Sequence, residues 1–182
     1  MSASDIRVAE VLGFWRAAGP ARWFMKDAAF DAAFRDRFLE LHFAAARREL
    51  DDWSTSAGGV LALLLLLDQF PRNAFRGTGH MYATDPLALR FARAALALGH
   101  DRLVDPALRV FFYLPFAHAE DSACQELSVE LNRGLGGDYA QHALGHRAII
   151  RRFGRFPHRN DLLGRSTTVE EAEFLAAGGF AG

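Results

Sequence analysis

Two short polar segments of the 182-residue sequence carry the same residue types around a proline. The first, at residues 70–73, reads FPRN, and the second, at residues 156–160, reads FPHRN. Arginine binds carboxylate and phosphate groups through two parallel N–H donors, and an asparagine amide adds further donors. We therefore expect the two segments to converge on one Arg-rich site that binds an anionic small molecule, either a carboxylate or a phosphate.

Asp68 stands between a long apolar run and the first of these segments. A carboxylate at that place is disfavoured by burial and by the negative end of the helix dipole, so it needs a cationic partner. Arg72 is one helical turn further on if the helix continues, and Arg155 and Arg159 belong to the second segment and its approach. The alternative is a purely structural salt bridge, which carries no information about function.

The arginines near both segments outnumber the acids that stand close to them in the sequence. Asp68 and Asp161 cannot satisfy all of these guanidinium groups, so helix C-terminal carbonyls, Glu120 or an outside anion must accept the remaining N–H donors. Each asparagine follows an arginine, and in the alternative reading it caps a turn. The residues predicted to bind the ligand are Asp68, Gln69, Arg72, Asn73, Arg76, Arg155, His158, Arg159, Asn160 and Arg165.

His118 and Glu120 are the candidates for acid and base catalysis, because a histidine beside a carboxylate can exchange protons near neutral pH. His142 and His146 have the i, i+4 spacing of helical metal ligands, but Ala143 stands where a zinc protease carries its glutamate. The zinc deaminase pattern needs a pair of cysteines, and the chain has a single one. We predict no metal and no other cofactor.

Composition and charge restrict the class of protein. A hydrophobic content of 51% in 182 residues is enough for one core without disulfides, so we expect a single helical domain over residues 1–182. The lone Cys124 and an N-terminus without a basic and apolar leader indicate a cytoplasmic protein. The longest apolar run is far shorter than the roughly 20 residues that cross a bilayer, so no membrane span is predicted. The net charge of -1 argues against nucleic acid as a partner.

Apolar residues recur at helical spacing along the chain, and no stretch has the alternation of a strand, so we predict an all-α fold. The first helix is expected over residues 5–18, with Ser4 as its N-cap and the Gly-Pro pair at 19–20 as its stop. Asp27 is predicted to cap a long second helix. Residues 60–67 are apolar all round, which predicts a central helix.

The second half of the chain has equally clear helix signals. Asp85 and Asp105 each precede a proline and are predicted to cap helices, the later of which ends or kinks at Pro115. Further helices are expected over about residues 120–133 and 138–153, and a last one begins at Thr168, whose spacing to Glu171 fits a capping box. About eight helices with short links predict antiparallel hairpins, either tetratricopeptide-like or in an irregular bundle.

Several strings spread over nearly the whole chain carry a family resemblance. The two longest are residues 67–73, which read LDQFPRN, and 153–160, which read FGRFPHRN; shorter ones are FRG at 75–77, YLPF at 113–116 and LGR at 163–165. Together they resemble the bacterial domain of unknown function family 924. Arg16 and Ala119 depart from the aromatic and the serine that the family often has. The resemblance implies a tetratricopeptide-like helical fold and no activity, since the family has none assigned.

Two functions of different classes follow from these patterns. In the first, the arginines hold a carboxylate or phosphate while His118 or Glu120 supplies acid and base capacity, with or without a reaction. In the second, a concave helical surface binds a protein partner and the polar cluster is structural. RNA binding through the Arg-rich stretch near residues 147–165 is a third reading, which the nearly neutral chain weakens.

Overall fold

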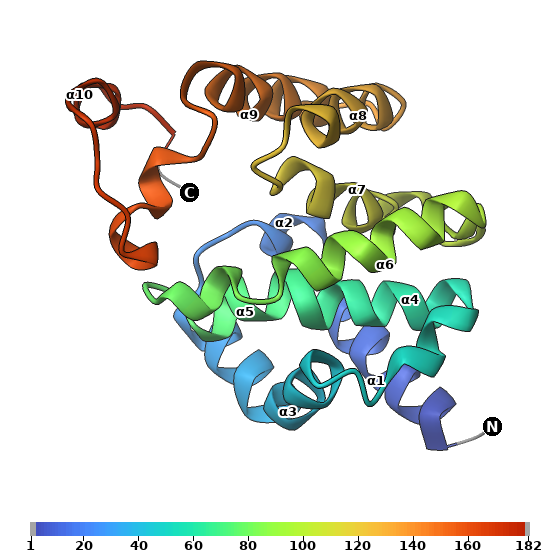
Figure 1. Cartoon of the computed structure of the whole chain (residues 1–182). Helices are drawn as coiled ribbons and strands as arrows, with labels where there is room; N and C mark the ends of the chain where they lie inside the picture. Colours follow the sequence, from blue (N-terminus) through green and yellow to red (C-terminus); the bar gives the residue numbers. More distant parts are fainter. Residues whose placement is uncertain (1–2, 181–182) are drawn as a thin grey trace. The chain divides into compact units, whose positions relative to one another are not determined.

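A computed structural model describes residues 3–180, and helices supply its regular structure, with no β-strand in that range (Figure 1). The all-α prediction is therefore confirmed. The chain is organised as two compact units. Unit 1 comprises the residues up to Arg76 together with His80–Pro115, and unit 2 comprises Gly77–Gly79 and the residues from Phe116 onward. A single domain over the whole chain stays a prediction.

Unit 1 contains the N-terminal helices and the most apolar segment of the chain. Its first helix ends at Ala18, directly before Gly19 and Pro20, as the sequence predicts. Short 3₁₀ turns at Asp51–Thr55, Gly79–Tyr82, His100–Leu103 and Pro106–Leu108 join the longer elements. The helices are α1 (Ala3–Ala18), α2 (Pro20–Trp23), α3 (Ala28–Ala46), α4 (Ala57–Leu64), α5 (Phe70–Ala74), α6 (Asp85–Ala97) and most of α7 (Val110–Ala117).

Local capping signals mostly form as expected. The Asp27 carboxylate accepts hydrogen bonds from the backbone N–H groups of Ala29 and Phe30 at 3.0 and 3.1 Å, so the predicted cap of α3 is confirmed. Asp105 likewise accepts from the N–H of Ala107. The predicted cap at Ser4 is wrong, because α1 already includes this residue. The position three residues after Ser4 is Arg7, so Ser4 lacks the acidic partner of a capping box.

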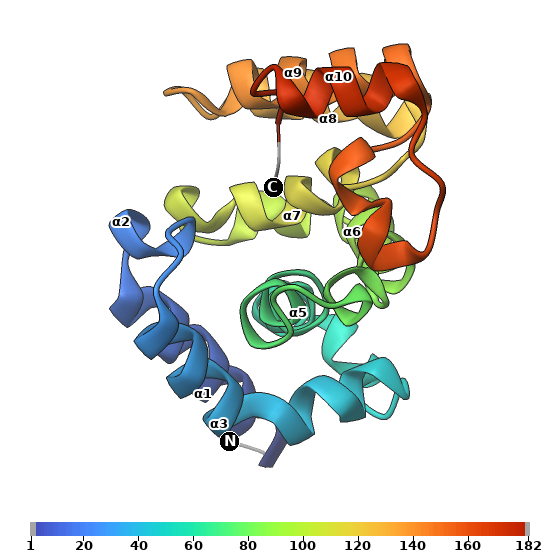
Figure 2. The ribbon, with the colours of Figure 1, turned by 90° about the vertical axis from the view of Figure 1, so that its left-hand side faces the viewer.

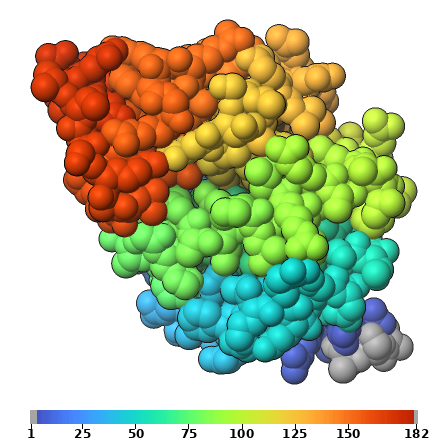
Figure 3. Space-filling view, in the orientation of Figure 1, coloured from blue at the N-terminus to red at the C-terminus, as the bar shows by residue number. Residues whose placement is uncertain are grey.

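The centre of unit 1 is the apolar run that includes α4. Residues 60–67 are all at most 1% exposed, which confirms the predicted central helix. Aromatic rings of α1 and α3 pack together beside it, with Phe14 stacked on Phe30 and Phe34 at centroid distances of 5.2 Å. The inner face of α6 buries Phe91 and Ala92, and the outer face of this helix lies at the surface of unit 1 (Figure 3).

The central run changes its hydrogen-bond pattern before the first polar segment. Leu65–Gln69 forms a π-helix, in which the N–H of Phe70 donates to the carbonyl of Leu65. The next residue is Pro71, which has no N–H to donate. The carbonyl of Leu66 instead accepts from Nδ1–H of the buried His42 at 2.9 Å, and the carbonyl of Leu67 accepts from the Thr84 hydroxyl. Side chains from α3 and from the start of α6 therefore replace missing backbone donors.

Unit 2 is built around a helical hairpin. Helix α8 (Ser122–Arg133) and helix α9 (Tyr139–Phe153) lie side by side and are joined by the short link 134–138 (Figures 1 and 2). Asp121 caps α8 through the N–H of Cys124. The C-terminal helix α10 (Val169–Ala176) begins with the predicted capping box of Thr168 and Glu171. The core of unit 2 includes Ile149, Ile150 and Phe156.

The predicted end of a helix at Pro115 does not form. Pro115 lies inside α7, which continues to Ala117, so the proline does not end this helix. Of the helices in residues 3–180, none combines the length and the apolar character that crossing a membrane requires.

Two adjacent glycines in α4 give a matched test of how this helix packs. A Cβ on Gly59 would stand 2.1 Å from the backbone carbonyl oxygen of Trp53, whereas a Cβ on Gly58 would meet only the Leu12 side chain at 3.6 Å. We expect Gly59→Ala to lower the free energy of unfolding by about 2 kcal/mol or more. Gly58→Ala should raise it by up to about 1 kcal/mol, through helix propensity. Urea unfolding followed by circular dichroism measures both, and equal effects would contradict the close approach.

Candidate functional site

The first polar segment lies in unit 1 and is helical, since α5 contains it. Asp68, at the π-helix, is 1% exposed, and its carboxylate accepts from the Gln69 amide at 2.6 Å. Arg72 approaches this carboxylate at 3.3 Å and donates to the Asp68 carbonyl at 2.7 Å. The i, i+4 pairing of Asp68 with Arg72 is thus the one expected for a continuing helix.

Arg72 has a second carboxylate partner, Asp85, which the sequence predicts to be a helix cap. Its guanidinium donates to both oxygens of Asp85, at 2.7 and 2.9 Å. Burial alone would lower the pKa of Arg72, but Asp68 and Asp85 together raise it above its ordinary value. The predicted N-cap at Asp85 is wrong: Thr84 is the cap residue of α6, and the Asp85 carboxylate is held by Arg72 instead.

The other two polar side chains of this region share one acid of α3. The Asn73 amide donates to one oxygen of Asp31 at 2.7 Å, and Arg76 donates to the other oxygen at 2.9 and 3.0 Å. Asp31 is 42 residues before Asn73 and 45 residues before Arg76, so proximity in the sequence gave no sign of it. The first segment is thus anchored to α3 and α6 of its own unit.

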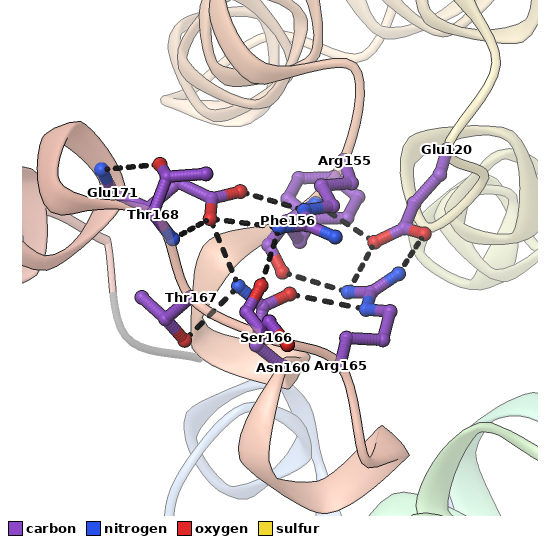
Figure 4. A network of polar contacts seen from close by, with 9 residues as sticks. All are labelled: Glu120, Arg155, Phe156, Asn160, Arg165, Ser166, Thr167, Thr168 and Glu171. Atoms are coloured by element: carbon purple, nitrogen blue, oxygen red, sulfur yellow. Dashed lines mark hydrogen bonds and ion pairs between the residues drawn. The ribbon is translucent and has the colours of Figure 1, made fainter.

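The second segment lies in unit 2, after α9, within the 3₁₀ turn Pro157–Arg159. Figure 4 shows the polar network around it. Both oxygens of Glu120 accept from the Arg165 guanidinium, at 2.6 and 3.0 Å, and one also accepts from the backbone N–H of Phe156 at 2.7 Å. Burial raises the pKa of Glu120, but Arg165 and the Phe156 N–H outweigh it and hold the pKa below its ordinary value.

A second carboxylate closes the same network. Glu171, at the start of α10, accepts two hydrogen bonds from Arg155 at 2.6 and 2.8 Å and one from the Asn160 amide at 3.2 Å (Figure 4). The hydrogen bond from Arg155 is the main cause that lowers the pKa of Glu171 to about 2. The amide oxygen of Asn160 accepts from Arg165 at 3.0 Å, which links the two ion pairs.

These contacts change the count of charges on which the anion site was predicted. Arg72, Arg76, Arg155 and Arg165 each have a carboxylate partner, and three of these four partners were not among the acids first considered. Each network pairs its guanidinium groups with acids from its own unit. That the two segments share a single site stays a prediction. The pairs are Arg72 with Asp85, Arg76 with Asp31, Arg155 with Glu171 and Arg165 with Glu120.

The fifth arginine belongs to a group that we call the histidine cluster, made of His118, His146, His158 and Arg159. Arg159 is 6% exposed, donates to the His118 carbonyl at 3.0 Å and lies over the Phe156 ring at 4.6 Å. His146 projects from α9, and His158 comes from the second segment itself. The cluster therefore gathers groups that are cationic or can become so.

Two imidazoles of the cluster have unsatisfied nitrogens. Among residues 3–180, the buried Nδ1 atoms of His146 and His158 have no hydrogen-bond partner. The rings of Phe156 and Phe180 pack on both histidines, with centroid distances between 4.7 and 5.7 Å. Buried polar atoms are almost always hydrogen-bonded, so two such nitrogens in one cluster require an explanation.

Burial and charge make both imidazoles neutral near pH 7. Burial is the main cause that lowers the pKa of His146 to about 3, and His118 and Arg159 act in the same direction. The pKa of His158 falls to about 4, first through burial and then through Arg159, against an opposing effect of Glu120. Within the described residues no three His, Cys, Asp or Glu side chains are arranged to hold a metal ion. A single negative charge beside His146 and His158 would favour protonation of their imidazoles.

The sequence reading named most of these residues but assigned two of them differently. His146 was considered only together with His142, as a pair with the spacing of metal ligands or as two surface or hydrogen-bonded histidines, and its burial against Phe156 could not be known from spacing. Glu171 was identified as the partner of Thr168 in the capping box, yet its contacts with Arg155 and Asn160 depend on the turn after α9. Phe180, near the C-terminus, gave no signal.

Comparison with known proteins gives a family and a solved relative. A family model described as "Bacterial protein of unknown function (DUF924)" matches residues 11–179. The chain is also similar to a solved structure described as "Structure of Protein of Unknown Function ATU0120 from Agrobacterium tumefaciens", with 60% identity and a TM-score of 0.94. That match covers 96% of this chain and 99% of the other. Comparison with curated proteins finds no match.

Removal of Arg72 tests whether the first network is structural. Arg72→Ala leaves the carboxylates of Asp68 and Asp85 without their shared guanidinium, so we expect the free energy of unfolding to fall by about 3–5 kcal/mol. Arg35→Ala, which breaks an exposed pair with Asp36, should change it by no more than about 0.5 kcal/mol. Urea unfolding compares them, and equal stability of the two variants would show that the buried acids do not need Arg72.

The histidine pKa values predict how stability depends on pH. The unfolded chain protonates His146 near pH 6.5, whereas the folded chain does so only near pH 3. Stability from the neutral ring is therefore fully present above pH 6.5 and is lost as the pH falls, by up to about 1.4 kcal/mol per pH unit. His158 and His42 act in the same direction.

Unfolding measured between pH 7.5 and pH 5 tests this dependence. That range lies above the ordinary pKa of the carboxylates, so the histidines dominate it. His146→Phe should show a shallower fall in stability than the unmodified chain, because one proton fewer is taken up on unfolding. Identical slopes would contradict the burial of a neutral imidazole at this position.

Proposed function

The chain belongs to the bacterial family of unknown function DUF924, and we propose that its unit 2 binds a small anion, a carboxylate or a phosphate, at the histidine cluster. The observation that carries the proposal is the pair of buried Nδ1 atoms on His146 and His158, which have no partner among residues 3–180. A neutral imidazole with its proton on Nδ1 would donate there to the anion, and charge-assisted hydrogen bonds are roughly twice as strong as neutral ones.

The local charge supports an anion over a neutral or cationic ligand. The groups that influence His146 are His118, Arg159, His142 and His158, and each of them lowers its pKa. An anion bound among them would be attracted to Arg159 and would favour protonation of the imidazoles. The aromatic rings of Phe156 and Phe180 would exclude water from two sides and strengthen these interactions.

The roles of the other predicted residues follow from their contacts. Glu120 has both oxygens bound to Arg165, so in this proposal it positions the second segment and does not transfer protons. His118 keeps its proposed acid and base capacity, and no reaction is assigned. Arg155, Asn160 and Arg165 support the site from the network of Figure 4. The first segment forms most of α5. Ligand binding by Asp68, Gln69, Arg72, Asn73 and Arg76 stays a prediction.

The proposal includes a cytoplasmic location. The lone cysteine, Cys124, is buried and is consistent with a reducing cytoplasm. The alternative function, a tetratricopeptide-like interaction scaffold, draws support from a different feature, an apolar groove beside α1 in unit 1.

Anion titrations test the site directly. Inorganic phosphate and succinate, added at constant ionic strength, should raise the melting temperature of the unmodified chain, because a ligand of the folded state stabilises it. We expect His158→Gln to weaken binding by about tenfold or more, since a hydrogen bond to a charged group contributes roughly 1.5–3 kcal/mol. Isothermal titration calorimetry measures the affinity.

A matched control separates this site from general surface charge. Arg152→Gln removes an exposed arginine of the same unit that pairs with Glu170, and it should leave the affinity unchanged. His158 is preferred to Arg159 for the test, because Arg159 is buried on the Phe156 ring and its loss would disturb folding. Equal affinity of all three proteins, or no stabilisation by either anion, would refute the proposal.

A further inference from the structure

An apolar groove of about 470 Å³ runs along α1 in unit 1. From α1 it is lined by Ile6, Ala9, Glu10, Gly13 and Phe14, and from α3 by Arg37. The inner face of α1 is occupied, since Val11 and Trp15 are fully buried. The groove therefore lies on the solvent side of the helix, where Ile6 is 47% exposed.

The solvent face of α1 permits a close approach by another helix. Ala9, Gly13 and Ala17 recur every four residues, so their small side chains lie in one line along this face. A Cβ on Gly13 would meet nothing within 4 Å, so no atom of the chain itself requires a glycine there. Glycine inside a helix costs roughly 1 kcal/mol relative to alanine, and small residues at a helix face allow two backbones to come close.

Two opposite charges border the groove without ion-pair partners. Among residues 3–180, neither Glu10 nor Arg37 forms an ion pair, although the Arg37 guanidinium lies over the rings of Phe14 and Phe38 at 5.9 and 5.3 Å. One surface thus carries an acid on one helix and a base on the neighbouring helix. Such a surface is complementary to itself, because a two-fold axis places each charge opposite its counterpart.

We infer that this groove is the interface of a symmetric dimer, in which α1 of a second copy packs against α1. The two helices cross in antiparallel orientation near Gly13, so that Ala9 of each copy lies near Ala17 of the other. Glu10 of each copy then pairs with Arg37 of its partner. A helix from another protein would pair with either Glu10 or Arg37, whereas a second copy of the chain supplies a partner for both.

Sedimentation velocity over a concentration series tests the dimer. The chain carries no N-terminal tag in this experiment, because a tag close to α1 could cover the groove. We expect a concentration-dependent dimer, and Gly13→Leu should raise the dimer dissociation constant by at least about tenfold, since it fills the line of small residues. The space around Gly13 leaves the fold of this variant intact, which a thermal melt checks.

A charge exchange identifies the pair that holds the two copies. Glu10→Arg and Arg37→Glu, made singly, place like charges together and should each weaken the dimer by at least about tenfold. The double variant restores opposite charges and should recover most of the affinity. Arg90→Glu makes the same charge change on the exposed side of α6 and should have no effect. A monomeric unmodified chain at every concentration, or a double variant no better than the singles, would overturn the inference.

Discussion

The missing N–H of Pro71 is the constraint on which much of unit 1 depends. The helix that contains residues 60–67 is buried on every side, so each of its carbonyls must be hydrogen-bonded within the protein. The π-helix moves the N–H of Phe70 to Leu65, and Pro71 donates nothing, which leaves Leu66 and Leu67 to other donors. His42 and Thr84 are those donors, and they tie α3 and the start of α6 to the end of the central run. The same requirement sets the tautomer of His42: because Nδ1 donates to a carbonyl, the neutral ring accepts at Nε2, where His80 stands 3.0 Å away.

The charges of the first segment follow from that arrangement. Thr84 is held at Leu67, so Asp85 is carried to the same place and reaches Arg72, which already pairs with Asp68. One guanidinium between two carboxylates would be costly to bury if any partner were missing, and complete pairing is what makes it tolerable. The FPRN sequence of this segment is thus explained by the closure of a helix end. An anion is not needed to account for the hydrogen bonds and ion pairs described for it.

Sequence reasoning succeeded where the interaction is local and failed where it is distant. The caps at Asp27, Asp105 and Thr168 involve neighbours two or three residues away, and apolar periodicity, which predicted the all-α fold, is a property of each segment alone. The cap at Asp85 was wrong because a side chain 13 residues earlier competes for its carboxylate. The count of acids failed for the same reason, since Arg76 pairs with Asp31, an acid 45 residues before it. The π-helix had no sequence signal apart from the proline that follows it.

The two polar segments look alike but differ at the position that decides their charge balance. Three residues before its proline, the first segment has Asp68, whereas the second has Gly154. The residue one turn before Arg72 is thus an acid, and the residue one turn before Arg159 is Arg155. The second segment also has an inserted His158 and lies in a 3₁₀ turn instead of an α-helix. The second segment itself therefore supplies a positive group, Arg159, and a titratable one, His158, to the histidine cluster. The acids that pair with its neighbours Arg155 and Arg165 are Glu171 and Glu120, which come from elsewhere in unit 2.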